Sequence, residues 1–289
     1  MPEVDIRPSN AYNVFCSGRG GEIGRRARLR GVWIKLHTGS SPVLGTIQNY
    51  FPRTDSYNPV NPKQIAGARA ATYIQSGMTV GLGTGSTAAY AVLAIGERVR
   101  NEALQIRCIA TSDSTAALAK EQGIELVGWE SVQRFDITID GADEVDPQFR
   151  MIKGGGGALL REKIVASLTD TEIIIVDSRK VVSALGAFAL PLAVIPFGWQ
   201  AVQRRIEDKY NRLAPARLKA DGSIYLTDEN FVILDVAFGA PMPDPDLLEP
   251  ALKCIPGVAE VGLFLGLCSR LIIGHDDGRI EERNAYPAP

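Results

Sequence analysis

Hydrophobic positions along residues 61–190 alternate between two patterns. Short apolar runs bounded by polar or glycine-rich turns predict buried strands, and segments with apolar side chains at helical spacing separate them. Strands are predicted at Thr79–Leu82, Ile106–Ala110, Ile124–Val127, Ile137–Ile139 and Ile173–Val176. Helices are predicted at Lys63–Ile74, Ala88–Val99, Thr115–Gln122 and from Ala158. This alternation indicates a doubly wound, mainly parallel α/β sheet of the Rossmann-like class.

From Pro191 the pattern changes. Strands are predicted at Leu192–Pro196, Ala216–Ala220, Phe231–Ala237 and Val258–Phe264, with helices at Trp199–Tyr210 and Pro245–Ile255. The order β-α-β-β-α-β is that of a ferredoxin-like α+β unit. A last apolar run, Leu271–Gly274, is predicted to return to the first sheet. We therefore predict a Rossmann-like catalytic domain of residues 59–190 plus 265–289, with a smaller ferredoxin-like domain of residues 191–264 inserted into it.

The first 58 residues differ in composition from the rest of the chain. They contain eight Lys or Arg residues and four acidic residues, a formal charge of +4, although the whole chain carries −2. The cluster Arg25–Arg30 shows no sustained helical or strand periodicity. We expect residues 1–58 to be a poorly ordered extension. An organelle-targeting peptide and a translation-start artefact are the open alternatives.

Composition also excludes several classes of protein. No apolar run reaches the length of a membrane span, so no membrane partner is predicted. The small net charge gives no general case for a nucleic-acid partner. The four cysteines are scattered and only two histidines accompany them, so the spacing of zinc ligands is absent. We expect reduced cysteines in an intracellular protein, with organelle targeting by residues 1–58 left open.

Polar side chains follow four of the predicted strands. The polar segments are Thr84–Thr87, Thr111–Ser114, Asp140–Asp143 and Asp177–Lys180. In open α/β sheets, ligands bind beyond the carboxyl ends of the strands. Independent loops would rarely all be so polar, so we expect these four segments to line a common cleft.

The segment Gly83–Ala88 follows a strand and matches the pattern GxGxxG/A. A dinucleotide site also needs an acid about 20 residues further on, and the next predicted strand runs into Thr111 instead. The hydroxyls of Thr84, Ser86 and Thr87, with the N–H groups of the following helix, suit a phosphate monoester better. The alternative is a tight turn with hydroxyl caps.

Charged residues surround a run of four glycines, Gly154–Gly157. Asp140 and Asp143 are either a cap and a turn acid or a metal site, although no histidine lies nearby to favour a transition metal. Lys153 is placed to stabilise an oxyanion, with the glycine N–H groups as a nest. Lys63 and Lys180 are candidates to add charge near a phosphate; a solvated surface lysine is the alternative.

Glu162 is predicted to lie on the apolar face of a helix. Its neighbours three and four residues away are Ala158, Leu159, Val165 and Ala166. Partial burial would raise its pKa toward the range of a general base, a role worth about 10²–10⁴ in rate. The alternative is an ordinary acid in the first turn, favoured by the helix dipole.

These motifs together resemble the ribose-5-phosphate isomerase family, type A. They are GLGTGSTA (81–88), TSDST (111–115), DGADEVD (140–146) and KGGGGALLREKIVA (153–166). The resemblance spans residues 61–278 and leaves the first 58 residues unexplained. Gly157, where the family frequently has alanine, and Leu267–Ser269 depart from the family pattern.

The resemblance implies interconversion of ribose 5-phosphate and ribulose 5-phosphate, in the non-oxidative branch of the pentose phosphate pathway, without metal or organic cofactor. Glu162 would be the base of a cis-enediolate mechanism. Asp140 would assist ring opening, and Asp143 and Lys153 would stabilise charged oxygens. The substrate-binding set would be Lys63, Thr84, Gly85, Ser86, Thr87, Gly141, Ala142, Gly154, Gly155, Gly156 and Lys180. The family also implies a homodimer or homotetramer and a cytoplasmic location.

Three other functions fit the sequence less well than the isomerase does. A non-catalytic sugar-phosphate sensor would keep the phosphate loop but lose the base or the lysine, and this chain retains both Glu162 and Lys153. A nucleotide-dependent oxidoreductase lacks its ribose-binding acid. A transferase with a glutamate nucleophile lacks a recognisable acyl-carrier site.

Overall fold

The computed structural model describes residues 26–29, 32–35 and 60–285. The chain divides into two units between Asn58 and Pro59, and each is described by itself. In the first unit, strand β1 (Arg26–Leu29) pairs antiparallel with β2 (Val32–Lys35). Part of the arginine cluster is thus a strand, although its sequence shows no strand periodicity. The rest of the predicted extension lies outside the described residues.

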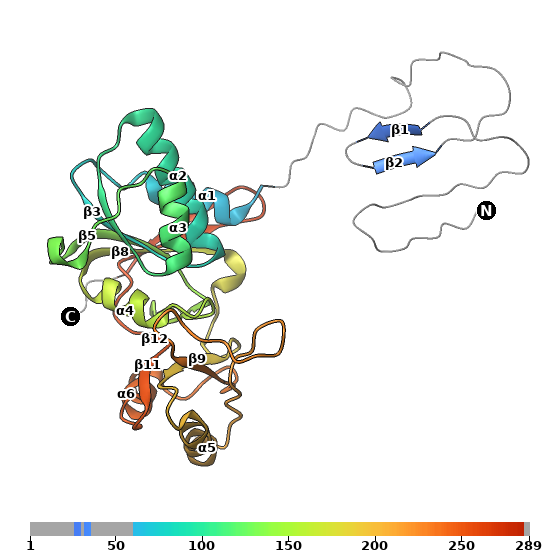
Figure 1. Ribbon diagram of the computed structural model, residues 1–289, viewed down its shortest axis with the longest axis vertical. Helices are drawn as coiled ribbons and strands as arrows, with labels where there is room; N and C mark the ends of the chain where they lie inside the picture. Colours follow the sequence, from blue (N-terminus) through green and yellow to red (C-terminus); the bar gives the residue numbers. More distant parts are fainter. Residues whose placement is uncertain (1–25, 30–31, 36–59, 286–289) are drawn as a thin grey trace, which may run out of the picture. The chain divides into compact units, whose positions relative to one another are not determined.

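The second unit is built around a six-stranded sheet in the order β14-β13-β8-β5-β3-β4. Figure 1 labels three of these strands, β3, β5 and β8. Five strands are parallel, and β14 runs antiparallel to β13. The strands are β3 (Thr79–Leu82), β4 (Arg107–Ala110), β5 (Phe135–Gly141), β8 (Thr169–Asp177), β13 (Arg270–Gly274) and β14 (Ile280–Asn284). The α/β class is confirmed; β14 was not predicted, because its residues are mostly charged.

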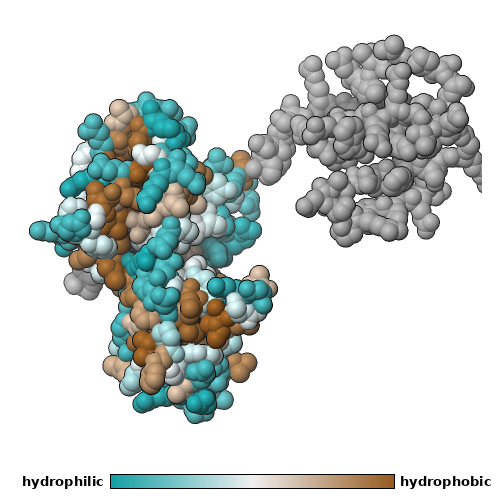
Figure 2. Space-filling model, in the orientation of Figure 1, coloured by the Kyte–Doolittle hydropathy of each residue, from teal (hydrophilic) through white to brown (hydrophobic). Residues whose placement is uncertain are grey.

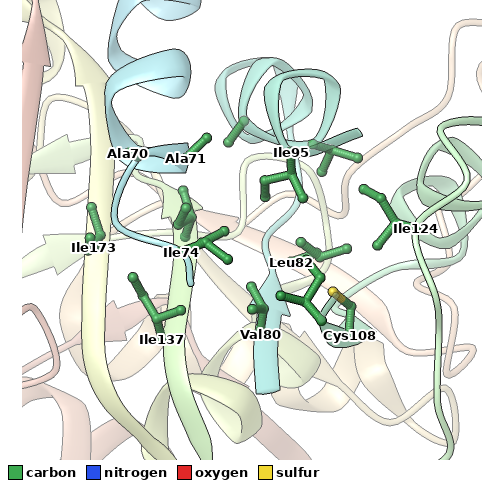
Figure 3. Packing of buried hydrophobic residues seen from close by; sticks show 14 of the residues in the cluster. Ala70, Ala71, Ile74, Val80, Leu82, Ile95, Cys108, Ile124, Ile137 and Ile173 are labelled. Carbon is green, nitrogen blue, oxygen red and sulfur yellow. The ribbon is translucent and has the colours of Figure 1, made fainter. Parts of the chain in front are cut away.

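Helices cover both faces of this sheet. Side chains of α1 (Pro62–Ala71), α2 (Ser86–Glu102) and α3 (Asp113–Glu121) pack on one face with residues such as Ile137 and Ile173 (Figure 3). On the other face, α4 (Leu159–Ser167) shares a cluster with Ile174 and Val176. Successive residues of β8 from Ile173 to Val176 face opposite layers that are both apolar, so this part of the strand is a continuous hydrophobic run. Short 3₁₀ turns lie at Trp129–Ser131 and Ser178–Lys180.

Two smaller sheets complete the second unit. One has the order β10-β9-β11, from β9 (Leu190–Val194), β10 (Val232–Val236) and β11 (Val258–Val261), with α5 (Trp199–Tyr210) and α6 (Pro245–Lys253) in the same part of the chain. The other joins β6 (Glu144–Val145), β7 (Met151–Ile152) and β12 (Leu263–Phe264). The division into a catalytic domain and an inserted domain of residues 191–264 stays a prediction.

The predicted strand Val258–Phe264 is divided at Gly262 between two sheets, as β11 and β12. The Gly262 N–H donates to the Pro191 carbonyl at 2.8 Å, and the Gly262 carbonyl accepts from the Lys153 N–H at 2.9 Å. A Cβ at Gly262 would lie 2.5 Å from the Lys153 carbonyl oxygen. Through Gly262, the backbone of Lys153 is therefore fixed against strand β9 of the β10-β9-β11 sheet.

Two predicted strands are wrong as continuous elements. Ile124–Val127 makes one parallel bridge, between Cys108 and Leu126. Ala216–Ala220 makes single bridges to Leu234 and Ile224. Leu218 is 58% exposed, and the chain turns back just after it, where the Lys219 N–H donates to the Ser223 carbonyl. Each segment pairs one residue at a time, so no ladder develops.

The described surface is mainly polar on the face shown in Figure 2, with smaller hydrophobic patches between hydrophilic side chains. Within residues 26–29, 32–35 and 60–285, no helix combines the length and the apolar character needed to cross a bilayer.

Candidate active site

A pocket of about 240 Å³ opens at the carboxyl ends of β3, β5 and β8. These strands are neighbours in the sheet, so segments far apart in the sequence meet there. All the predicted site residues except Asp140 line it. The lining consists of Lys63, Thr84, Gly85, Ser86, Thr87, Gly141, Ala142, Asp143, Lys153, Gly154, Gly155, Gly156, Glu162 and Lys180.

One part of this pocket is suited to an anion. Gly85, with a φ of 106°, turns the chain from β3 into the first residue of α2, so the N–H groups of the first helical turn begin at the pocket. The Lys63 ammonium donates to Ser86 Oγ at 2.8 Å. Lys180 follows the end of β8 and lines the same pocket. A helix N-terminus beside hydroxyls and two lysines provides the donors and positive charge that a phosphate needs.

The polar segment Thr111–Ser114 does not line the pocket, so the prediction of one cleft shared by all four strand ends is wrong for this segment. Its hydroxyls instead support Thr84 from behind. Thr84 Oγ1 lies 2.7 Å from Thr111 Oγ1 and 3.3 Å from Thr115 Oγ1. Each of these threonines is fixed in turn by a backbone carbonyl: the Thr111 hydroxyl donates to the Leu82 carbonyl and the Thr115 hydroxyl to the Gly83 carbonyl. The sequence pattern could not separate a lining hydroxyl from a supporting one.

The Lys153 ammonium is surrounded by acceptors. Its Nζ lies 2.8 Å from Asp140 Oδ2 and 3.5 Å from Glu162 Oε2, and it donates to the Gly141 carbonyl. The side chain is 2% exposed. Although burial alone would lower it, the carboxylates of Asp140 and Glu162 raise the pKa of Lys153 above its usual value. Lys153 is therefore a fixed positive charge at the pocket wall.

The two aspartates have different surroundings. Asp140 Oδ1 accepts from the N–H groups of Thr84 and Gly141, at 3.0 and 2.7 Å, and its other oxygen faces Lys153. A Cβ at Gly83 would lie 2.1 Å from Asp140 Oδ1, which explains the glycine there. Asp143 lines the pocket and accepts from the Gly155 N–H at 2.7 Å.

These contacts bear on the metal alternative. Asp140 is paired with an ammonium ion and Asp143 with a backbone amide. Among the described residues, no group of three or more His, Cys, Asp or Glu side chains is arranged to hold a metal ion.

Glu162 lies on the buried face of α4 with Leu159, Val165 and Ala166, as its helical spacing predicted. Its side chain is 4% exposed, yet it lines the pocket. Within the described part of the chain, its Oε2 has no hydrogen-bond partner. Burial raises the pKa of Glu162 to about 8, against the opposing effect of Lys153. A buried carboxylate that lines a pocket and has a raised pKa has the properties of a general base.

Two features near the pocket were not predicted from the sequence. Glu172 on β8 is 1% exposed, and burial raises its pKa well above the usual value; the signal was an acid directly before the apolar run Ile173–Val176. Arg217 and Tyr225 contact the glycine run from the other side. These two residues gave no signal, because the contacts join positions more than 60 residues apart.

The fold and the pocket together define an α/β protein that binds a small phosphorylated molecule beside a candidate proton-transferring carboxylate. Residues 107–278 match the ribose 5-phosphate isomerase A (phosphoriboisomerase A) family. Relatives named ribose-5-phosphate isomerase A occur in Ruegeria pomeroyi and a Jannaschia species. Each is 46% identical to this chain over 80% of its length and 90% of the relative. The chain belongs to the ribose-5-phosphate isomerase A family.

Solved structures agree with this assignment. The ribose 5-phosphate isomerase of Plasmodium falciparum is 36% identical, with a TM-score of 0.74 over 77% of this chain and 97% of that one. A D-ribose-5-phosphate isomerase in complex with phospho-erythronic acid is 34% identical, with a TM-score of 0.74 over 78% of this chain and 99% of that one. The part of the chain that carries the pocket therefore has the fold of these enzymes.

Proposed function

We propose that this protein interconverts D-ribose 5-phosphate and D-ribulose 5-phosphate through a cis-enediolate. The observation that carries this proposal is the Glu162 carboxylate, which lines the same pocket as the N-terminus of α2 and the Lys153 ammonium. In the open-chain aldose, Glu162 removes the proton on carbon 2. The electron pair forms the carbon–carbon double bond of the enediolate, and Glu162 returns the proton to carbon 1 while a hydroxyl proton moves between the two oxygens. No electrons are exchanged with another molecule.

The anion-binding part of the pocket would hold the phosphate. Ser86, Thr87 and the N–H groups at the start of α2 supply donors, and Lys63 and Lys180 supply charge. The glycines of the wall and Thr84 would contact the sugar. The related isomerase that binds phospho-erythronic acid supports this assignment, because that ligand carries a phosphate and, at its other end, a carboxylate whose single negative charge is shared by two oxygens.

Lys153 would stabilise the negative charge that develops on the substrate oxygens. Asp143 would position them, together with the Gly155 backbone that it holds. For Asp140 we propose a role different from the ring opening that the resemblance implies. Its side chain is 2% exposed, does not line the pocket and accepts from three donors, so it would act by holding Lys153 in place.

The test of this function is a direct assay of ribulose 5-phosphate formed from ribose 5-phosphate, with and without excess chelator. We expect turnover in both conditions, because the buried ammonium of Lys153 stands beside Asp140 and supplies the positive charge. If chelator abolished turnover and a divalent metal ion restored it, the proposed mechanism without a metal ion would be contradicted. Binding of ribose 5-phosphate without turnover would support the sensor instead.

We expect the rate to depend on pH through Glu162. The base must be ionised, and burial raises the pKa of Glu162 to about 8 in the free protein. Below that pH the carboxyl is protonated, so kcat/KM should fall as the pH is lowered through about 8. The measurement is kcat/KM from pH 6 to 9.5. A profile that stays flat across this range, as expected if the base had the usual glutamate pKa of about 4.3, would exclude the buried carboxylate as the base.

Two further proposals rest on the family resemblance alone. They are assembly into a homodimer or homotetramer and a cytoplasmic location. Light scattering of the purified full-length chain tests the first proposal, and imaging of the tagged chain in its own cells tests the second.

A further inference from the structure

We infer that Arg217 is a positioning residue for the isomerisation: it fixes the glycine loop, residues 154–157, that forms one wall of the pocket. This inference rests on the proposed function and adds to it a residue that lies outside the pocket lining. Four successive glycines lose more conformational freedom on ordering than any other sequence of that length. A fixed wall therefore needs contacts from outside the loop.

Arg217 supplies two of these contacts. Its Nη1 donates to the carbonyl oxygens of Gly154 and Gly155, at 2.9 and 3.0 Å. The other edge of the guanidinium pairs with Asp235 on β10, from Nε to Oδ2 at 2.9 Å and from Nη2 to Oδ1 at 2.5 Å. Because Asp235 holds the planar guanidinium from a strand, the two donors to the loop have a fixed direction.

Tyr225 supplies a third contact from the same part of the chain. Its hydroxyl donates to the Gly156 carbonyl at 3.2 Å. Three successive carbonyls of the glycine loop are thus hydrogen-bonded to Arg217 and Tyr225. The next residue, Gly157, has a φ of 83°, and a Cβ there would lie 2.3 Å from the Tyr225 hydroxyl. The glycine at this departure from the family pattern therefore allows the close approach of Tyr225.

The loop is held from the opposite side as well. The Gly155 N–H donates to Asp143 Oδ2 at 2.7 Å, and a Cβ on Gly155 would lie 2.5 Å from Asp143 Oδ1. The glycine loop lies between an aspartate of the pocket and a guanidinium outside it. It continues directly from Lys153, so a displaced loop would also displace the oxyanion-stabilising ammonium.

The segment that carries Arg217 and Tyr225 is itself anchored further along. Asp228 accepts from the Asp113 N–H, at the start of α3, at 2.9 Å. Arg161 on α4 pairs with Asp113 at 2.8 Å and also with Asp228 and Glu229. Residues 216–231 are therefore attached to the larger sheet's helices at one end and to β10 at the other. Because its segment is attached at both ends, Arg217 is held in a fixed position relative to the glycine loop.

The test compares Arg217→Met with wild type in the ribose 5-phosphate assay. We expect kcat to fall about 10- to 100-fold, the usual cost of a small misplacement of catalytic groups, with a smaller change in KM because the phosphate contacts remain. The matched control is Arg212→Met. Arg212 donates to the carbonyls of Phe238 and Asn211, at 3.2 and 3.1 Å, and has no part in the pocket. Its kcat should stay near wild type.

Conservative variants keep the inference testable if Arg217→Met does not fold. Arg217→Lys keeps the charge but cannot hold Asp235 and two carbonyls together, so its kcat should lie between those of wild type and Arg217→Met. Tyr225→Phe should lower kcat less, and in combination with Arg217→Lys the effects should be non-additive, since both act through one loop.

The contrary outcomes are distinct. A folded Arg217→Met or Arg217→Lys protein with the kcat of Arg212→Met would overturn the positioning role. A fall confined to the melting temperature, with turnover per folded molecule unchanged, would assign Arg217 to stability alone. A wild-type protein with no isomerase activity would overturn the proposed function instead.

Discussion

Glu162→Gln is expected to remove ribose-5-phosphate isomerisation almost completely. General bases contribute about 10²–10⁴ to a rate, and we expect the upper part of that range, about 10³-fold or more, in kcat. The amide keeps the shape of the carboxyl but cannot take the carbon-bound proton. The phosphate contacts are unchanged, so substrate binding should persist. Single-turnover kinetics and calorimetric binding of ribose 5-phosphate separate these two effects.

The melting temperature of Glu162→Gln distinguishes loss of the general base from loss of the folded structure. Burial opposes the charged form of Glu162, as its raised pKa shows, and Lys153 keeps its closer partner Asp140 when Glu162 is replaced. Replacing it with a neutral amide should leave the melting temperature unchanged or raise it. An inactive variant with a clearly lower melting temperature would point to misfolding, and near-normal turnover would exclude Glu162 as the base.

Glu172→Gln is the matched control for this prediction. Glu172 is as buried as Glu162 but does not line the pocket. Burial, with the nearby Asp140 charge, raises the pKa of Glu172 well above its usual value. Glutamine keeps the size of this side chain, and because Glu172 does not line the pocket the variant should keep most of its turnover. Comparing the turnover of the two variants distinguishes the effect of replacing any buried acid from the effect of replacing the acid that lines the pocket.

The difference between these two acids shows what a single sequence can predict. Glu162 was found because a helix repeats every 3.6 residues, so its apolar neighbours could be identified from spacing alone. Likewise, parallel strands end at one edge of a sheet, which predicted the meeting of Thr84 and Asp143. In the first case the period of the helix shows which way a side chain points, and in the second the shared direction of the strands shows where it lies.

The missed features depend on contacts that have no local period. Arg217 lies in a segment that makes single bridges instead of a ladder, and its partners in the glycine loop precede it by more than 60 residues. The division at Gly262 is similar: its neighbours are the backbones of Lys153 and Pro191. Sequence spacing indicates faces and strand ends, but it does not indicate which distant loop will lie against them.

Lys153→Met should lower kcat by about 10²–10³, the cost of removing one oxyanion donor from a pre-organised site. Methionine keeps most of the side-chain volume and removes the ammonium ion. KM should change less, because the phosphate is held elsewhere in the pocket. The pH profile should also move: without the Lys153 charge, which now opposes the effect of burial, the pKa of Glu162 rises further and kcat/KM falls at a higher pH.

The structure also predicts a loss of stability that must be separated from the loss of rate. Asp140 would keep its two backbone donors but lose its cation, and breaking a buried pair costs about 3–5 kcal/mol. The double variant Lys153→Met/Asp140→Asn removes the stranded charge. It should recover much of the melting temperature but none of the turnover. Recovery of turnover would show that Lys153 serves the fold and not the reaction.

Lys163→Met provides the control for a lysine in the same layer. Its ammonium lies 5.0 Å from the centroid of the Phe264 ring, which Lys153 approaches to 5.3 Å, and it pairs with Glu249 and Glu260 at 2.7 and 2.9 Å. It does not line the pocket. Removing it should lower the melting temperature while turnover per folded molecule stays near wild type. A decrease in kcat as large as that of Lys153→Met would mean that disturbance of this layer, and not loss of an oxyanion donor, slows the reaction.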